Sequence, residues 1–380
     1  MIADTLGYFE SRRGEIARAI GSLVPDSGPS RESMERIAEF CGRGKMIRGC
    51  LVFLGAEIAG AGNGADLPLV AAAMELFQAG LLAHDDIMDR DELRRGSPTI
   101  HARYAAEAEA RAEAFGRVGG FPPGEARHLG EALAICLGDL CYFAAFETLS
   151  RALAGNSSLG EIVGLCGSVL GEVAVAQMTD VAWGAGSDEV PEEKILEMYR
   201  GKTAHYSFSL PLAVGALAAV GGPAGGTENS ADRGAAPGAA ARESLVRRLY
   251  EFGERLGLLF QIRDDELGLF GSAESIGKVA GSDLREGKKT LFRSRLLSAA
   301  PVSEQERLRA FFGGGLEAKS EDIAYIKRLS EELGVARSIA DMSRKAEDEA
   351  RTIIDALPSI ERSARSVLEG LVDYVTRREK

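Results

Sequence analysis

Several residue types are scarce in this sequence. Its 380 residues include one tryptophan, four histidines, five cysteines and 12 prolines, and aromatic residues make up only 6%. The cysteines form no CxxC pair, which excludes the usual zinc spacings, and an odd, scattered set predicts reduced thiols in a cytoplasmic protein. His101, His128 and His205 have no acidic partner at a spacing that indicates a site. With few aromatics, the core must consist mainly of Ala, Leu, Val, Ile and Gly, which suits closely packed helices.

Long hydrophobic runs are also missing. The longest stretch without Asp, Glu, Lys or Arg is 203–227, and its apolar part runs from Leu210 to Val220. That part is too short to span a bilayer, which takes ~20 residues in a helix. The sequence therefore predicts a buried helix that ends at Gly221, and no transmembrane segment is expected.

Positive charge is deficient as well. The 45 Lys and Arg residues stand against 57 Asp and Glu, which gives a net charge of −12. A field of this sign repels phosphate, so a general nucleic-acid or anionic-membrane binder is excluded. Any phosphorylated ligand must then be held by local basic residues or by bridging metal ions.

Apolar residues recur at helical spacing through most of the chain. Met74, Phe77, Leu81 and Met88, for example, follow one another at three-, four- and seven-residue intervals. Strand-like alternation is hard to find, so an all-α fold is predicted. Segments 105–128 and 221–240 break the pattern with Gly- and Pro-rich stretches and are expected to be surface inserts.

An acidic group follows the apolar run Leu67–Ala83, in which only Glu75 is charged. Asp85 and Asp89 lie four residues apart, so on a helix their carboxylates share one side and repel unless a cation lies between them. For an isolated DDxxD pattern, a solvated acidic face is an open alternative. The position at the polar end of an apolar helix favours Mg²⁺, which takes one or two protein carboxylates and completes its octahedron with water and phosphate oxygens.

A second acidic pair follows another apolar helix. Asp264 and Asp265 come shortly after Leu256–Phe260, and Lys278 and Lys288 trail them. The GxxxxGK[ST] spacing of a P-loop is absent, which excludes that phosphate site. Two acid pairs, each trailed by basic residues, predict one cavity in which metal ions bridge carboxylates to a diphosphate and Arg and Lys bind the remaining oxygens. Residues 1–380 are therefore expected to form a single all-α domain.

Together these segments resemble the trans-polyprenyl (isoprenyl) diphosphate synthase family, over most of the chain and most closely its short-chain geranylgeranyl and farnesyl members. Five segments carry the resemblance, in family order: Gly44-Lys45-Met46-Ile47-Arg48; Asp85–Asp89 with Arg94-Arg95; Gln177–Asp180; Lys202-Thr203; and Phe260-Gln261 with Asp264-Asp265, then Lys278 and Lys288. The sequence departs from the family at Gln78 (often His), Gly49 (often Pro) and Gly268 (often Asp). The last departure removes one carboxylate that many members of the family have on that side.

The resemblance implies a helical bundle around a central apolar cavity and a role for each matching residue. Asp85 and Asp89 would ligate two Mg²⁺ ions and Asp264 a third, with Asp86 and Asp265 in support. Lys202, Thr203 and Gln261 would be catalytic, the latter two beside the reacting allylic carbons. The other matching residues would bind substrate: Arg94, Lys202 and Lys278 the allylic diphosphate, and Lys45, Arg48, Gln78 and Arg95 isopentenyl diphosphate. Lys288 would be a further substrate-binding residue.

The implied reaction is the Mg²⁺-dependent head-to-tail condensation of isopentenyl diphosphate with dimethylallyl, geranyl or farnesyl diphosphate, in a homodimer. In this family, residues one and two turns before the first acidic motif commonly set product length. Gly80 and Leu81 stand there, and Phe77, Tyr142, Phe143 and Phe146 are candidates for the cavity floor. Because Gly80 cannot block the cavity as an aromatic residue would, a geranylgeranyl-length product is expected.

Other readings stay open. They are a farnesyl or longer-chain synthase, a class I terpene cyclase, which needs no second diphosphate site, and a non-catalytic regulatory subunit. Lys45, Arg48 and Arg95 speak against the cyclase. The intact acidic motifs speak against the regulatory subunit. His84 is expected to be a polar supporting residue. The terminal segment 377–380 is expected to be a frayed charged tail, and folding over the diphosphate site is the alternative.

Overall fold

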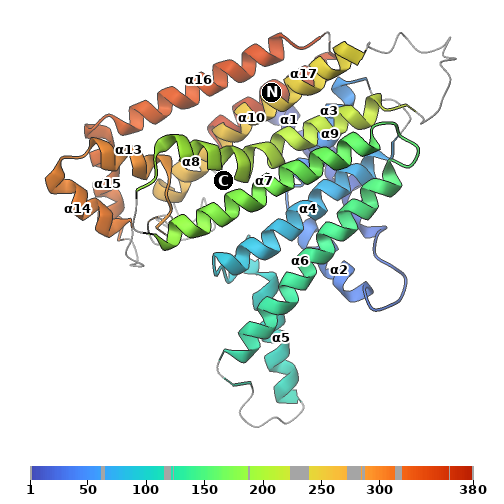
Figure 1. The fold of residues 1–380 in the computed structure, drawn as a ribbon, viewed down its shortest axis with the longest axis horizontal. Coiled ribbons are helices and arrows are strands. Elements are labelled where there is room, and N and C mark those ends of the chain that lie inside the picture. The colour runs from blue at the N-terminus through green and yellow to red at the C-terminus, as the bar shows by residue number, and fades with distance from the viewer. Residues whose placement is uncertain are drawn as a thin grey trace.

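The computed structural model describes residues 2–60, 65–114, 121–122, 124–186, 189–222, 239–271, 284, 287–312, 319–358 and 360–378. These residues are almost entirely helical, as predicted, and most long helices lie alongside one another in a bundle (Figure 1). The first half comprises α1 (Ile2–Gly21), α2 (Arg31–Gly42), α3 (Ile47–Ile58), α4 (Leu67–Met88), β1 (Leu93–Arg94), β2 (Ser97–Pro98), α5 (Ile100–Ala114), α6 (Glu125–Ala152) and α7 (Leu159–Ala185). The second half comprises α8 (Glu192–Tyr199), the π-helix η1 (Arg200–Ser209), α9 (Leu210–Val220), α10 (Ala239–Phe270), α13 (Leu291–Ala299), α14 (Val302–Phe311), α15 (Ser320–Glu332), α16 (Val335–Asp355) and α17 (Arg362–Arg377).

Helix α4 is the most enclosed of the long helices that carry the predicted motifs. Asp66 caps it by accepting a hydrogen bond from the backbone N of Leu69 at 3.3 Å, and Pro68 stands in the first turn, where its missing N–H leaves no helical bond unmade. The helix is apolar on nearly every side and packs against α1, α2, α3, α5, α6 and α9. Its polar C-terminal end therefore emerges from the core with Asp85 and Asp89 upon it.

Small residues allow the helices to approach closely. A Cβ at Gly55 would lie 2.1 Å from the Leu212 carbonyl oxygen, and one at Gly215 would lie 2.0 Å from that of Val52. Helices α3 and α9 thus touch backbone to backbone, which any larger side chain would prevent. The predicted helix Leu210–Val220 is confirmed: it is α9, and nearly all of its residues are buried. One continuous apolar core runs from Phe9 in α1 to Val375 in α17.

The two segments predicted as inserts are only partly described. Helices α5 and α6 enter segment 105–128 from its two sides, and α5 with the first turns of α6 projects from the bundle (Figure 1). In segment 221–240, residues 223–238 lie outside the described part of the chain.

One hairpin interrupts the helical pattern, and the sequence reading missed it. Strands β1 and β2 pair antiparallel, with Arg94 opposite Ser97. The two-residue loop between them, Arg95-Gly96, has φ angles of 53° and 73°. Positive φ at both positions is what a type I′ hairpin turn requires. The hairpin brings Arg94 and Arg95 back towards the end of α4.

Four helical stretches in the described residues are long and apolar enough to cross a membrane by length and composition alone. For 67–88 and 192–220, 67% and 78% of the most apolar window is buried inside the protein, whereas for α6 and α7 the shares are 33% and 28%. The prediction that no segment spans a membrane was based on the stretch 203–227 and did not take these helices into account. Packing within the bundle accounts for the apolar character of the first two but leaves much of α6 and α7 uncovered.

Candidate active site

A cavity of about 1000 Å³ opens where α4, α7, η1 and α10 end near one another. Its lining combines apolar and aromatic side chains, such as Leu81, Tyr142, Val173 and Phe260, with many charged ones. Most of the sequence-predicted site residues line it: Lys45, Arg48, Gln78, Leu81, Asp85, Asp89, Arg94, Arg95, Lys202, Thr203, Gln261, Asp264, Asp265 and Lys288. All five motif segments therefore meet in one cavity, as predicted.

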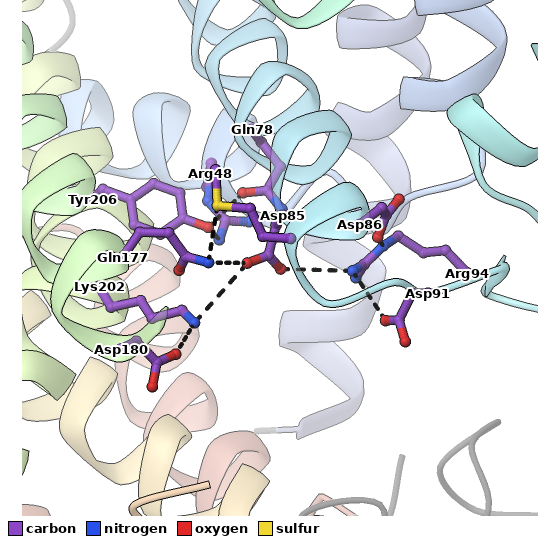
Figure 2. Close-up of polar contacts among 11 residues, drawn as sticks. Arg48, Gln78, Asp85, Asp86, Asp91, Arg94, Gln177, Asp180, Lys202 and Tyr206 are labelled. Atoms are coloured by element: carbon purple, nitrogen blue, oxygen red, sulfur yellow. Dashed lines mark hydrogen bonds and ion pairs between the residues drawn. The ribbon is translucent and has the colours of Figure 1, made fainter. Parts of the chain in front are cut away.

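Asp85 lies at the centre of the first acidic group (Figure 2). Gln177 Nε2 donates a hydrogen bond to Asp85 Oδ1 at 2.9 Å, while Arg94 and Lys202 place cationic nitrogens 3.7 and 3.9 Å from its carboxylate oxygens. Asp85 and Asp89 also stand at the C-terminal end of α4, where the helix dipole adds negative potential. The site therefore favours cations strongly, and Arg94 and Lys202 supply them in this structure.

Asp86 faces away from the cavity and holds Arg94 in place. Its side chain has no exposed surface, and Arg94 Nε donates to its Oδ1. Burial raises the pKa of Asp86 to about 6. Its Oδ2 has no hydrogen-bond partner among the described residues. The predicted metal-supporting role for Asp86 is therefore indirect, because its carboxylate binds an arginine rather than lining the cavity.

The π-helix η1 presents Lys202, Thr203 and Tyr206 to the cavity. π-helical turns are rare and occur mostly at functional sites. Lys202 Nζ donates to Asp180 Oδ2 on α7, which holds the ammonium between Asp180 and Asp85 (Figure 2). Burial lowers the pKa of Lys202, but Asp180 and Asp85 outweigh it and raise the pKa above its ordinary value. Lys202 is thus a permanent cation at the mouth.

A second basic group lies beside the first. Arg48 Nη2 donates to Tyr206 Oη at 2.7 Å and to Ser207 Oγ at 2.6 Å, and its guanidinium stacks 4.4 Å from the centre of the Tyr206 ring. Tyr206 Oη donates to Gln78 Oε1 at 2.7 Å. Glu75 lies beneath this group with both Arg48 and Arg95 near it, and its Oε1 accepts from the Gly49 backbone N at 2.8 Å. Arg48 is thereby fixed from several sides before any ligand arrives.

The end of the chain meets the second acidic motif. Arg378 Nη2 donates to Asp264 Oδ1 at 2.7 Å, and its guanidinium lies 4.1 Å from the centre of the Phe260 ring. Tyr374 Oη accepts from Lys45 Nζ at 2.9 Å. The expectation of a frayed tail is wrong for Arg378, because Asp264 and Phe260 bind it over the cavity.

Comparisons with known proteins agree with this geometry. A family model described as polyprenyl synthetase matches residues 31–330. The chain belongs to the polyprenyl synthetase family. It is 31% identical to a short chain isoprenyl diphosphate synthase of Methanothermobacter thermautotrophicus, over 98% of this chain and 97% of the relative. It is 29% identical to a geranylgeranyl diphosphate synthase of Saccharolobus solfataricus, over 90% and 88% of the two chains.

A solved structure of the family is similar throughout. The geranylgeranyl pyrophosphate synthase from Corynebacterium glutamicum, complexed with isoprenyl diphosphate and magnesium, superposes with a TM-score of 0.79. It is 26% identical, and the match covers 98% of each chain. The all-α fold predicted from the sequence is therefore the fold of this family.

The donor set of the cavity fits divalent cations. Asp85, Asp89 and Asp264 bring hard carboxylate oxygens to one cavity. Within the described part of the chain, no three His, Cys, Asp or Glu residues are grouped closely enough to hold a metal by themselves. That suits Mg²⁺, which takes few protein carboxylates and completes its shell with water and phosphate.

The predicted chain-length residues are distributed differently from expectation. Leu81 lines the cavity, but Gly80 faces α6, where a Cβ would lie 2.9 Å from both the Gly138 oxygen and Tyr142 Cε1. Phe77 is buried behind the lining, with its ring edge-on to Phe146 at 4.9 Å. The prediction that Phe143 forms part of the cavity floor is wrong, because its side chain is 70% exposed on the surface of α6. Tyr142 is the aromatic residue of α6 that lines the cavity.

Some residues lie outside the described part or were not anticipated. Lys278 lies outside the described residues. Glu75, Tyr206 and Tyr374 line the cavity without having been predicted. The sequence could have predicted Tyr206, because it follows Lys202 by four residues and so lies on the same side of a helix. His205, which has no acidic partner at a telling spacing, contacts Glu172 and Glu254.

Proposed function

We propose that this protein is a prenyltransferase that condenses isopentenyl diphosphate with an allylic diphosphate, head to tail, to a short-chain product. One observation carries the proposal: Asp85, Asp89 and Asp264 line a single cavity together with two separate basic groups and with apolar side chains such as Leu81 and Val173. A reaction that joins two diphosphate esters of hydrocarbons needs these three features together.

The two basic groups support two diphosphate sites. Arg94 and Lys202 lie against the first acidic motif, so a diphosphate bound there is shared with metal ions. The second group is held by a different set of contacts, with Arg48 fixed by Tyr206 and Ser207, and Lys45 by Tyr374. A terpene cyclase has one diphosphate substrate and would not need the second group. The second group therefore favours chain elongation.

Magnesium would be held by Asp85 and Asp89 on one side and Asp264 on the other, three ions in all, and would neutralise charge on the leaving diphosphate. The chain's own residues do the rest. Arg94 and Lys202 would stabilise the departing diphosphate, Lys45, Arg48, Arg95 and Gln78 would hold isopentenyl diphosphate, and Lys288 would add positive charge at the mouth. The apolar walls would exclude water, which would otherwise capture the cation.

The bond changes balance without a further co-reactant. The allylic C–O bond breaks and its electron pair leaves with diphosphate. The terminal alkene of isopentenyl diphosphate then forms the new C–C bond with the allylic carbon. One proton is lost to the released diphosphate, which restores a double bond and yields an allylic diphosphate longer by five carbons.

We propose a geranylgeranyl-length product. The cavity is deep enough to reach Tyr142, and Leu81 beside it is aliphatic rather than aromatic. Farnesyl or longer products are the alternatives. A regulatory subunit without activity is disfavoured because the cavity retains its acidic and basic groups.

A homodimer accounts for the uncovered surfaces of α6 and α7. Both helices expose large apolar side chains, with Phe143, Val175 and Met178 each more than 60% exposed. Surfaces of this kind mark interfaces, and self-association of identical faces with twofold symmetry is the commonest arrangement. Sedimentation analysis tests it: Phe143→Asp should shift a dimer towards monomer, and a monomeric unaltered protein would refute the assembly.

The decisive experiment is incubation with Mg²⁺, labelled isopentenyl diphosphate and, in turn, dimethylallyl, geranyl and farnesyl diphosphate. Mass analysis of the dephosphorylated product should show C20 alcohol as the longest major species. Asp85→Asn serves as the matched inactive control, since it keeps the size of the side chain and removes the charge. A folded protein that elongates none of the three primers contradicts the proposal.

A further inference from the structure

A chain of hydrogen bonds leads from a buried peptide group to the reacting end of the cavity. The Leu291 backbone N donates to Tyr199 Oη at 3.0 Å, and Tyr199 Oη donates to Asp265 Oδ2. Gln261 Nε2 donates to Asp265 Oδ1 at 2.8 Å, and Thr203 Oγ1 donates to Gln261 Oε1 at 2.7 Å. Tyr199 and Asp265 are 1% and 6% exposed, so this part of the chain is shielded from water.

The direction of every bond in this chain follows from chemistry. A carboxylate only accepts hydrogen bonds, so the amide of Gln261 must turn its NH₂ group to Asp265. The carbonyl oxygen of Gln261 then faces Thr203 and can only accept. The single hydroxyl proton of Thr203 is thereby committed to Gln261. The lone pairs of the Thr203 oxygen, rather than its proton, are then available to the cavity.

Thr203 and Gln261 both line the cavity, beside Lys202 and Asp264. This is the part of the cavity where the proposed reaction breaks the allylic C–O bond. Oriented dipoles that meet developing charge in a shielded site stabilise a transition state without reorganisation. An oxygen whose lone pairs face the carbon stabilises positive charge there, whereas a hydroxyl proton pointed at that carbon would destabilise it.

We propose that Asp265 is a positioning residue that aims the oxygen of Thr203 at the allylic cation, through the amide of Gln261. This rests on the proposed prenyl transfer. It assigns Asp265 a role different from the metal support that the sequence resemblance implies. Both of its oxygens already accept hydrogen bonds, from Tyr199 and Gln261.

Asp265→Asn tests the direction of the chain without removing a partner. The Tyr199 proton is buried and needs an acceptor, so the new amide turns its oxygen to Tyr199 and its NH₂ to Gln261. Gln261 must then rotate its amide, which presents NH₂ to Thr203 and drives the hydroxyl proton towards the cavity. Each of the four side chains keeps a hydrogen-bond partner among the described residues, so the protein is expected to fold. The intended change is the direction of one hydrogen bond: Thr203 Oγ1 accepts from Gln261 instead of donating to it.

The expected result is a kcat lowered about tenfold to hundredfold, with the KM for both substrates and the Mg²⁺ concentration for half-maximal activity within about twofold. Thr203→Val should lower kcat in the unaltered protein but should not lower it further in Asp265→Asn, because it removes the misdirected hydroxyl proton. Asp373→Asn is the matched control, because Asp373 is also 6% exposed but its carboxylate pairs with Arg351 in α16. This variant should keep the kcat of the unaltered protein.

A binding measurement adds a readout that does not need turnover. An allylic diphosphate analogue with an ammonium nitrogen at the branched carbon mimics the cation, and its saturated carbon analogue does not. With Mg²⁺ present, calorimetry should show that the unaltered protein prefers the ammonium compound, and that Asp265→Asn loses about tenfold of this preference.

Two outcomes would overturn the proposal. An increase above fivefold in the Mg²⁺ requirement, with the ammonium preference retained, would make Asp265 a metal ligand. An unchanged kcat in Asp265→Asn would remove its role altogether. Failure of the proposed function looks different, since the unaltered protein itself would then elongate no primer.

Discussion

Arg378 and Asp264 form an ion pair at 2.7 Å across the mouth of the cavity. The arginine is mostly buried, with 12% of its side chain exposed, while Asp264 is half exposed. The guanidinium therefore occupies a place beside the carboxylate to which the third metal ion is assigned. In the proposed mechanism, Arg378 would therefore compete with a metal ion for the Asp264 carboxylate.

Replacing Arg378 with Ala should strengthen metal binding by the protein without substrates. An ion pair with one exposed partner is worth ~0.5–1 kcal/mol, which corresponds to a gain of about two- to fivefold in affinity for Mg²⁺ or Mn²⁺ by calorimetry. Arg377→Ala is the control, since it makes the same change of charge at an exposed neighbour. Equal affinities in both variants would show that Arg378 does not compete for the site.

Gly44 leaves room for the guanidinium of Arg95, and Gly44→Ala should displace that guanidinium. A Cβ at Gly44 would lie 2.7 Å from Arg95 Nη1, so the guanidinium must move away from the predicted isopentenyl diphosphate site. We expect the KM for isopentenyl diphosphate to rise about tenfold, in line with the loss of one charged hydrogen bond, with little change in kcat. Gly42→Ala is the matched control, because a Cβ there meets nothing within 4 Å. An unchanged KM in Gly44→Ala would argue against Arg95 as a substrate ligand.

Tyr142 is expected to limit product length. Tyr142→Ala removes the ring that lines the inner wall and should allow at least one further five-carbon addition, visible by mass analysis of the dephosphorylated products. Phe143→Ala, at the exposed neighbour, should leave the product length as it is. If the two variants give the same products as the unaltered protein, the floor of the cavity lies elsewhere.

His205 should make stability depend on pH. Its Nδ1 lies 2.9 Å from Glu172 Oε2 and its Nε2 lies 3.4 Å from Glu254 Oε2. Burial lowers the pKa of His205, but the hydrogen bonds to Glu254 and Glu172 outweigh it and raise the pKa. The hydrogen bond to His205, with Arg255 and Arg200 nearby, lowers the pKa of Glu254 to about 2.

The sign of the effect follows from these two shifts. The contribution of His205 to the free energy of unfolding is complete below its ordinary pKa of ~6.5. It is lost as pH rises through the raised pKa of His205 in the folded protein. The contribution of Glu254 to the free energy of unfolding is lost as pH falls from 4.5 towards its lowered pKa of about 2. His205→Gln should therefore lower the free energy of unfolding by ~1 kcal/mol near pH 5–6, and by less at pH 9 or pH 3, in urea denaturation. His128→Gln, at an exposed position, should show no such window, and a pH-independent loss in His205→Gln would contradict the ion pair.

The sequence predicted correctly which segments meet at the cavity. The apolar helix before Asp85 and the five motif segments all face one cavity, because a buried helix can end in acids only where it leaves the core. The reading was inaccurate where a role depends on which way a side chain points. Phe143 and Tyr142 are neighbours in sequence and differ in this respect, since successive helical residues point about 100° apart.

Composition and pattern alone determined that this chain is helical and that its acids need cations. These conclusions rest on helical periodicity and on the chemistry of single side chains, which do not depend on the fold. Only the tertiary structure decided that Asp86 holds Arg94, that Arg378 folds over Asp264, and that Asp265 reaches Thr203 through Gln261. Those relationships join residues across different elements, and hydrogen-bond direction and burial exist only once the elements are packed.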